Sequence, residues 1–179
     1  MALRIEHHST SEWPAVRVYE ALADIDYLRG RLQELGGAST ELVEHESTDS
    51  GMRFEVRQGV SVDALPAVAR TLIGGDLIID RSESWRRAEE NHYTGEIAAE
   101  MAGVPCTITG SMWLRDFPVP TEDASEPSSG TSELLVDGVV RVNIPLLGGK
   151  LEALVVDQVR QLLSAEALFT ADWLKQRAS

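Results

Sequence analysis

The chain has 179 residues, of which 43% are hydrophobic and 25% charged, and this is the composition of a globular protein. Its 29 acidic and 16 basic residues give a formal net charge of -13, which argues against nucleic acid and anionic membranes as partners, because both attract basic surfaces. Charged residues interrupt every hydrophobic run, so no membrane-spanning helix is expected.

The first predicted element is a strand, because apolar and polar residues alternate over residues 3–8. Apolar residues at helical spacing follow from Trp13 to Leu35, and a break near Ala23-Asp24 favours two short helices over one. The pair Gly36-Gly37 then predicts the end of the second helix, since glycine suits a helix C-terminus.

Strands dominate the next hundred residues. Segments 40–48 and 52–60 flank Asp49-Ser50-Gly51, whose residue types favour a hairpin turn. Residues 64–74 predict a short helix or an apolar loop, with Pro66 tolerable in a first helical turn. Further strands are predicted over residues 77–87, 91–101, 104–116 and 131–143, which makes seven strands in all.

The segment between Phe117 and Gly130 is rich in proline, serine, threonine and acidic residues, and it predicts a mobile hairpin loop. A linker between two domains is the alternative. Both flanking segments are predicted strands, however, and neither half of the chain has a separate set of core residues. We therefore expect a single domain over residues 1–179.

The last predicted element is an amphipathic helix over residues 150–177. At 1.5 Å per residue such a helix is roughly 42 Å long, enough to cross a seven-stranded sheet. At 100° per residue, one face is expected to be buried and to contain Leu151, Val155, Gln158, Leu162, Ala165 and Phe169. The sequence thus predicts an α+β fold in which this helix closes over a curved antiparallel sheet.

This order of elements resembles the helix-grip fold of START-like proteins, the SRPBCC or polyketide cyclase-like superfamily, over nearly the whole chain. Three segments also look like an uncharacterised actinobacterial family, domain of unknown function 2505. They are residues 66–70 before a tryptophan-bearing strand, Gly103-Val104-Pro105, and the most specific of the three, the stretch Ile-Pro-Leu-Leu-Gly-Gly-Lys-Leu-Glu at residues 144–152.

The superfamily resemblance implies a hydrophobic cavity between the sheet and the C-terminal helix. Relatives use such a cavity to carry lipids, hormones or polyketides, or to cyclise polyketides. The resemblance to the narrower family supplies no catalytic residue.

Gln158 is the first candidate for a ligand contact, because a polar amide on a buried helix face must be hydrogen-bonded. Its partner would be a sheet residue, a buried water or the polar end of a ligand. Arg81 is the second candidate, because with Glu83 and Trp85 it shares the inward parity of its strand. Arg81 would bind a carboxylate or carbonyl inside, unless a bulge turns it outward.

Aromatic and apolar strand residues predict the rest of the cavity wall, either as core packing or as ligand contacts. Gly110 would leave space between Ile108 and Met112 beneath the helix. The candidate cavity-lining residues are Phe54, Arg81, Trp85, Tyr93, Cys106, Ile108, Met112, Val155, Gln158, Leu162 and Phe169.

No catalytic residue, metal site or cofactor is predicted. Cys106 has no histidine near it in sequence and is expected to be a buried, inert thiol. His7 and His8 would face opposite sides of a strand, which excludes a shared metal. Gly148-Gly149-Lys150 lacks both the earlier glycine and the following hydroxyl of a phosphate-binding loop.

The predicted function is binding or transport of a lipid, fatty acyl or polyketide-like molecule in the cavity. A cyclase or aromatase using Arg81, Gln158 and Tyr93 is the alternative, and a surface scaffold is a third hypothesis. The single cysteine and the absence of a signal-like N-terminus predict a cytoplasmic protein. The expected partner is an apolar small molecule, without membrane insertion or nucleic acid.

Overall fold

The computed structural model describes residues 2–37, 39–65, 67–117 and 131–179. The predicted loop after Phe117 and the predicted role of Pro66 therefore lie outside the described residues. In chain order the elements are β1 (Ala2–Ser11), α1 (Ala15–Ala23), α2 (Ile25–Leu35), β2 (Ser39–Thr48), β3 (Gly51–Val60), the 3-10 helix η1 (Val62–Ala64), α3 (Ala67–Leu72), β4 (Leu77–Glu89), β5 (His92–Met101), β6 (Val104–Phe117), β7 (Thr131–Val142) and α4 (Gly148–Arg177).

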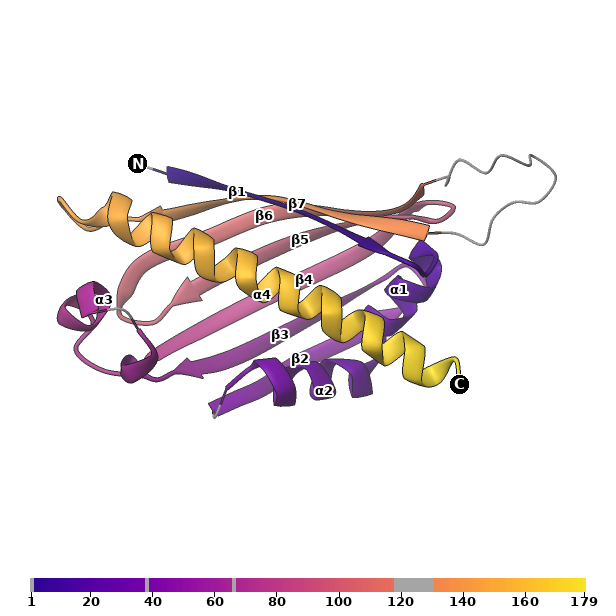
Figure 1. Cartoon of the computed structure of the whole chain (residues 1–179), viewed down its shortest axis with the longest axis horizontal. Coiled ribbons are helices and arrows are strands. Elements are labelled where there is room, and N and C mark those ends of the chain that lie inside the picture. The colour runs from indigo at the N-terminus through magenta and orange to yellow at the C-terminus, as the bar shows by residue number, and fades with distance from the viewer. Residues whose placement is uncertain (1, 38, 66, 118–130) are drawn as a thin grey trace.

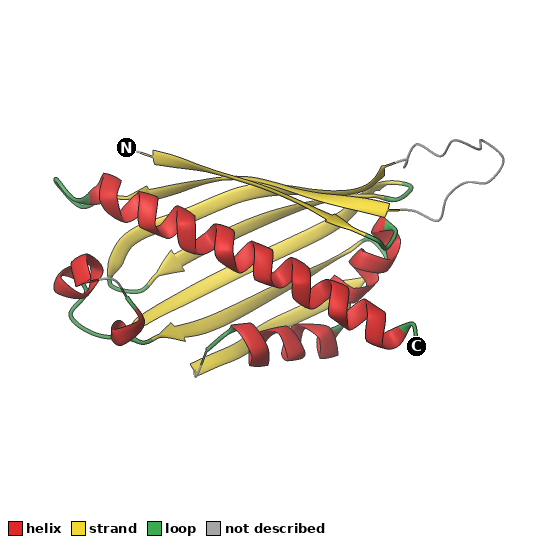
Figure 2. Cartoon of the chain, in the orientation of Figure 1, coloured by secondary structure: helices red, strands yellow, loops and turns green. Residues whose placement is uncertain are grey.

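The described strands form one antiparallel sheet in the order β1-β7-β6-β5-β4-β3-β2. The sheet curves around α4, which crosses one of its faces diagonally, while α1 and α2 lie beside the C-terminal half of α4 (Figure 1). The helices and the strands thus form two layers (Figure 2). The seven predicted strands and the closing helix are confirmed, and each boundary lies within a few residues of the prediction.

The break between the first two helices has a local cause. Asp24 is extended at φ -80° and ψ 124°, and its side chain accepts a hydrogen bond from the Asp26 backbone N–H at 2.7 Å. An aspartate in this position caps the first turn of a new helix. The sequence therefore forms α1 and α2 rather than one continuous helix, as predicted.

The predicted buried face of α4 is wrong in its rotation beyond the first turn: Leu151 is buried, as predicted, but Gln158 is exposed. Val155, Leu162 and Phe169, which were expected in the centre of that face, are only partly buried. The side chains that face inward are offset by about one residue along the helix and are Glu152, Val156, Val159, Leu163, Glu166, Thr170 and Leu174. Because this line includes two glutamates and a threonine, a search for apolar residues at helical spacing selects the neighbouring line instead.

Two clusters of buried side chains fill the space between the layers. The first joins α1, α2 and the C-terminal half of α4 to the sheet, with Tyr27, Phe54 and Trp85 among its members. The second lies at the other end, where α3 and the first turns of α4 pack on Val140 and Cys106. No helix in the described part of the chain is long and apolar enough to cross a membrane.

Candidate functional site

Four charged side chains meet beneath the middle of α4, and we call them the Arg–Glu cluster: Arg31 from α2, Arg81 and Glu83 from β4, and Glu166 from α4. The guanidinium of Arg81 donates to both carboxylate oxygens of Glu166, from Nη1 to Oε1 at 2.7 Å and from Nη2 to Oε2 at 3.2 Å. Its Nη2 also donates to Glu83 Oε2 at 2.8 Å. The cluster thus ties the helix layer to the sheet through a two-pronged pair.

Aromatic side chains surround these charges. Trp85 Nε1 donates to the second oxygen of Glu83 at 2.7 Å. The guanidinium carbon of Arg31 lies 5.3 Å from the ring centre of Phe54 and 5.7 Å from that of Tyr27, in cation–π contacts. Arg31 Nε is 3.8 Å from Glu166 Oε1, so its interaction with that carboxylate is ionic rather than a close hydrogen bond.

Regular strand geometry explains why Arg81 faces inward. Its pairing with Val56 on β3 and with Ala99 on β5 is continuous, and the register of β4 shifts only beyond Arg87. The alternation of the strand is therefore kept from Leu77 onward, and the alternative in which a bulge turns Arg81 outward is wrong. Arg81 faces inward, and the carboxylates that it binds there are those of Glu83 and Glu166. Its contact with a ligand stays a prediction.

A hydroxyl pair joins the cluster to α2. Thr170 Oγ1 donates to the backbone oxygen of Glu166 at 2.7 Å, so its proton is in use. The 2.7 Å contact between the Tyr27 hydroxyl and Thr170 Oγ1 is then a hydrogen bond donated by Tyr27. Tyr27 is fully buried, and this bond satisfies its hydroxyl.

The opposite charges of the cluster keep one another ionised. Burial raises the pKa of the Glu166 carboxyl, but the guanidinium groups of Arg31 and Arg81 outweigh this effect and lower the pKa to about 2. Burial likewise lowers the pKa of Arg81, and the carboxylates of Glu166 and Glu83 more than reverse that change. Glu166 is therefore ionised at neutral pH, and Arg81 remains charged.

A pocket of about 70 Å³ lies beside the cluster. Its wall combines the four charged residues with apolar side chains of α1, β6, β7 and α4, among them Leu22, Met112, Val136 and Leu163. Arg81 is one of the lining residues, and its Nε is buried without a hydrogen-bond partner among the described residues. An unsatisfied donor of this kind costs about 1–3 kcal/mol unless a water or a ligand accepts its hydrogen bond.

Three of the candidate residues from the sequence line this pocket, namely Arg81, Trp85 and Met112. Phe54 contacts Arg31 through the cation–π interaction described above. The ring of Phe169 packs at a tilt against that of Tyr27, with ring centres 5.5 Å apart. Val155 and Leu162 lie on α4 outside the pocket wall, as does the exposed Gln158.

The remaining candidates lie elsewhere in the protein. Tyr93 is buried against α1, where its ring stacks on Tyr19 at a centroid distance of 4.2 Å. Cys106 and Ile108 belong to the second core cluster. Burial, and then the charge of Glu152, raises the pKa of the Cys106 thiol to about 11, which fits the predicted inert thiol.

Sequence reasoning missed Arg31, Glu166, Tyr27 and Thr170, and it noticed Glu83 only by its parity. Arg31 and Glu166 lie 135 positions apart in the numbering, and a charged residue on an amphipathic helix is normally a solvated one. One signal in the sequence could have indicated Glu166: an Arg81 that faces inward needs a buried carboxylate as its partner.

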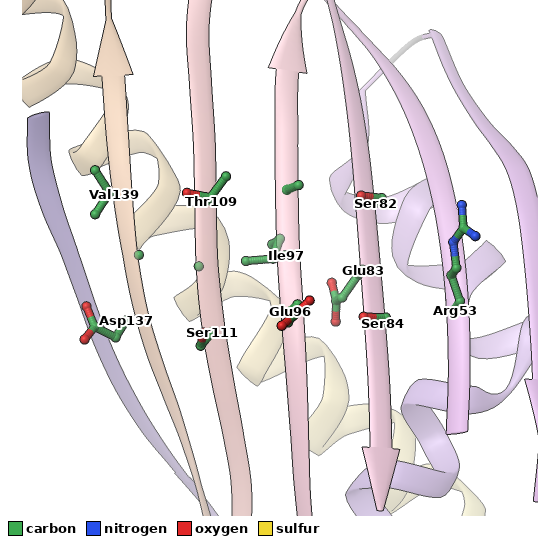
Figure 3. A pocket seen from close by; sticks show the side chains of 13 residues that line it. Arg53, Ser82, Glu83, Ser84, Glu96, Ile97, Thr109, Ser111, Asp137 and Val139 are labelled. Atoms are coloured by element: carbon green, nitrogen blue, oxygen red, sulfur yellow. The ribbon is translucent and has the colours of Figure 1, made fainter. Parts of the chain in front are cut away.

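A second hollow of about 620 Å³ lies on the opposite face of the sheet, with the helices behind the strands in this view (Figure 3). Short polar side chains such as Ser82, Ser84 and Ser111 form its floor, and Arg53 and Asp137 lie at its sides. It is open, and apolar side chains such as Ile97 and Val139 lie among its polar ones. No group of three or more metal-binding side chains occurs within the described residues.

The antiparallel sheet closed by a long C-terminal helix is a helix-grip fold. One solved structure with the same fold is TTHA0849 of Thermus thermophilus, with a TM-score of 0.59, 18% identity, and coverage of 99% of this chain and 100% of that one. Another is the Zhui aromatase/cyclase of Streptomyces sp. R1128, with a TM-score of 0.51, 18% identity, and coverage of 100% and 97%. At these identities the likeness concerns the fold alone.

The chain belongs to the family described as Protein of unknown function (DUF2505), whose model matches residues 6–174. It is 32% identical over 162 residues to Uncharacterized protein Rv0481c of Mycobacterium tuberculosis, and the match covers 88% of each chain. The family resemblance seen in the sequence is thereby confirmed.

Proposed function

We propose that this protein binds an apolar small molecule between the sheet and α4, with the polar end of the molecule at Arg81. One observation carries the proposal. Arg81 lines a pocket whose other walls are largely apolar, and its Nε is buried without a hydrogen-bond partner among the described residues. A lipid, fatty acyl or polyketide-like molecule with one polar end has the matching chemistry.

Such a molecule requires the pocket to widen. The pocket of about 70 Å³ is smaller than the roughly 300–1,000 Å³ of most small-molecule sites. Three of its neighbours, Leu163, Val136 and Met112, are held by packing alone, whereas the Arg–Glu cluster is fixed by directional hydrogen bonds. We therefore expect the apolar tail to displace hydrophobic side chains while the cluster stays in place.

A pocket-filling variant tests this proposal. Ala167 of α4 lines the pocket, so Ala167→Phe should occupy the space and reduce ligand uptake at least about ten-fold. Uptake of methyl decanoate and decanol would be measured by native mass spectrometry and by quenching of tryptophan fluorescence. Thermal unfolding of the variant would show that it remains folded.

Ala153→Phe is the matched control, because Ala153 lies on the same helix and is exposed. We expect this variant to bind like the wild type. Equal uptake by wild type and Ala167→Phe, or no uptake by the wild type of either probe, would contradict the proposal.

The cyclase or aromatase alternative has less support in the geometry. Its three residues are not brought together, because Gln158 is exposed and Tyr93 is stacked on α1, while Arg81 is inside the cluster. The shared fold of the aromatase/cyclase named above does not supply the missing groups. Binding is therefore the function that we propose.

A further inference from the structure

The charges on the pocket wall balance one another. Among the described lining residues the charged ones are two arginines, Arg31 and Arg81, and two glutamates, Glu83 and Glu166. Arg31, Arg81 and Glu83 are 3%, 8% and 3% exposed, and the Glu166 side chain is 12% exposed. The net charge of the site is therefore zero if all four groups are ionised.

The hydrogen bonds show that they are ionised. Both oxygens of Glu83 accept, one from Arg81 and one from Trp85, and both oxygens of Glu166 accept from Arg81. A protonated carboxyl would have to donate from one of these oxygens, and each guanidinium is permanently charged. His7 adds no cation to this site, because burial, followed by the neighbouring His8, outweighs the charge of Glu166 and lowers the pKa of His7, which is neutral at neutral pH.

Among the buried side-chain atoms of the described lining residues, the one without a hydrogen-bond partner is a donor. Arg81 Nε–H is the unsatisfied group, whereas the carboxylate oxygens already have partners. A ligand that satisfies this group has to bring an acceptor. A carboxylate would bring one together with an extra negative charge beside Glu83 and Glu166, and an uncompensated buried charge is strongly unfavourable.

We infer that this site, if it binds apolar molecules as proposed above, selects those whose polar end is an uncharged acceptor, such as an alcohol, ketone or ester, and discriminates against carboxylates. The selectivity comes from Glu166 and Glu83, which neutralise the two arginines. Without either glutamate, the same site would carry a surplus positive charge and would attract an anion.

The test compares decanol, methyl decanoate and ionised decanoate at neutral pH, by titration of tryptophan fluorescence and by native mass spectrometry. In the wild type we expect the two uncharged probes to bind at least about ten-fold more tightly than decanoate. Any apolar site would favour an uncharged molecule over a charged one. The decisive quantity is therefore the change in the preference for decanol over decanoate when a glutamate of the site is replaced.

Glu166→Gln and Glu83→Gln each leave one surplus positive charge, and either should improve decanoate binding relative to decanol by about ten-fold or more. Glu152→Gln is the matched control. Glu152 is a fully buried glutamate of the same helix, but it does not line the pocket, and its carboxylate accepts from the backbone N–H of Val142, a member of the second core cluster, at 3.0 Å. Glu152→Gln should therefore leave the preference for decanol over decanoate unchanged.

The outcomes separate the two proposals. Decanoate binding as tightly as decanol to the wild type would overturn the inference and leave the proposed binding function standing. The variants give a second test. If Glu166→Gln or Glu83→Gln folds and keeps the wild-type preference for decanol over decanoate, the inference is overturned as well. Binding of none of the three probes to the wild type would refute the proposed function itself.

Discussion

Arg81 is the residue on which the buried charges depend. Its guanidinium contacts the carboxylates of both Glu83 and Glu166, and all three side chains are largely withdrawn from solvent. A buried ion pair contributes little net stability compared with well-packed apolar residues, but removal of one partner leaves the other charge without compensation. Loss of Arg81 would leave the buried carboxylates of Glu83 and Glu166 without the positive charge that compensates them.

Arg81→Ala should therefore lower the free energy of unfolding by about 3–5 kcal/mol. The matched control is Arg57→Ala on β3, whose 2.7 Å pair with Asp80 lies at the surface with both side chains about half exposed. That variant should unfold almost like the wild type. Urea titrations would compare the three proteins, and similar losses from the two variants would contradict the buried role of Arg81.

Glu166 gives the cluster a dependence on pH with a definite sign. Its pKa in the folded protein is about 2, below the ordinary value of 4.5, so the folded state favours the ionised form. The resulting stabilisation is complete above the unfolded-state pKa and is lost as the pH falls from about 4.5 through about 2. The variant Glu166→Gln mimics the protonated carboxyl and therefore lacks this stabilisation at every pH.

We expect the difference in unfolding free energy between wild type and Glu166→Gln to be about 3 kcal/mol at neutral pH and to shrink as the pH falls below about 4.5. Urea titrations at a series of pH values would measure it. A difference that stays constant from neutral to acidic pH would show that Glu166 is not held ionised by Arg31 and Arg81.

At the level of single elements, the strands were far more predictable than the contacts of α4. Alternation of period two predicted the extent of β4 to within two residues and limited Arg81 to two directions, because a strand has only two faces. The continuous register of β4 then shows that Arg81 faces inward. A helix can rotate continuously, and the orientation of α4 is set by its packing on β1 and β7 and by Glu166. Those constraints come from residues far away in sequence, so the periodicity of α4 alone selected the wrong line of residues.

The observed rotation of α4 predicts different costs for two identical substitutions. Leu163 is 6% exposed and lines the pocket, so Leu163→Ala should lower the free energy of unfolding by about 2–5 kcal/mol. Leu168 is 70% exposed, and Leu168→Ala should change it by less than about 0.5 kcal/mol. Thermal or urea unfolding would compare them, and equal costs would mean that α4 is rotated differently.

Across the whole molecule, the interior is divided between two apolar clusters, and the Arg–Glu cluster with its pocket lies at the edge of the first. The sequence indicated the two layers and the closing helix, because their patterns are local. It did not indicate that a charge-balanced group would join them, since that group requires α2, β4 and α4 to meet. The hollow on the outer face of the sheet is the competing location for a ligand (Figure 3).

A crystal structure of the protein with methyl decanoate would test the proposed binding most directly. We expect the acyl chain between α4 and the sheet, beside Leu163 and Met112, with an ester oxygen within hydrogen-bonding distance of Arg81 Nε. A molecule bound in the outer hollow, or an unchanged pocket under α4 at saturating concentrations of the ester, would contradict it.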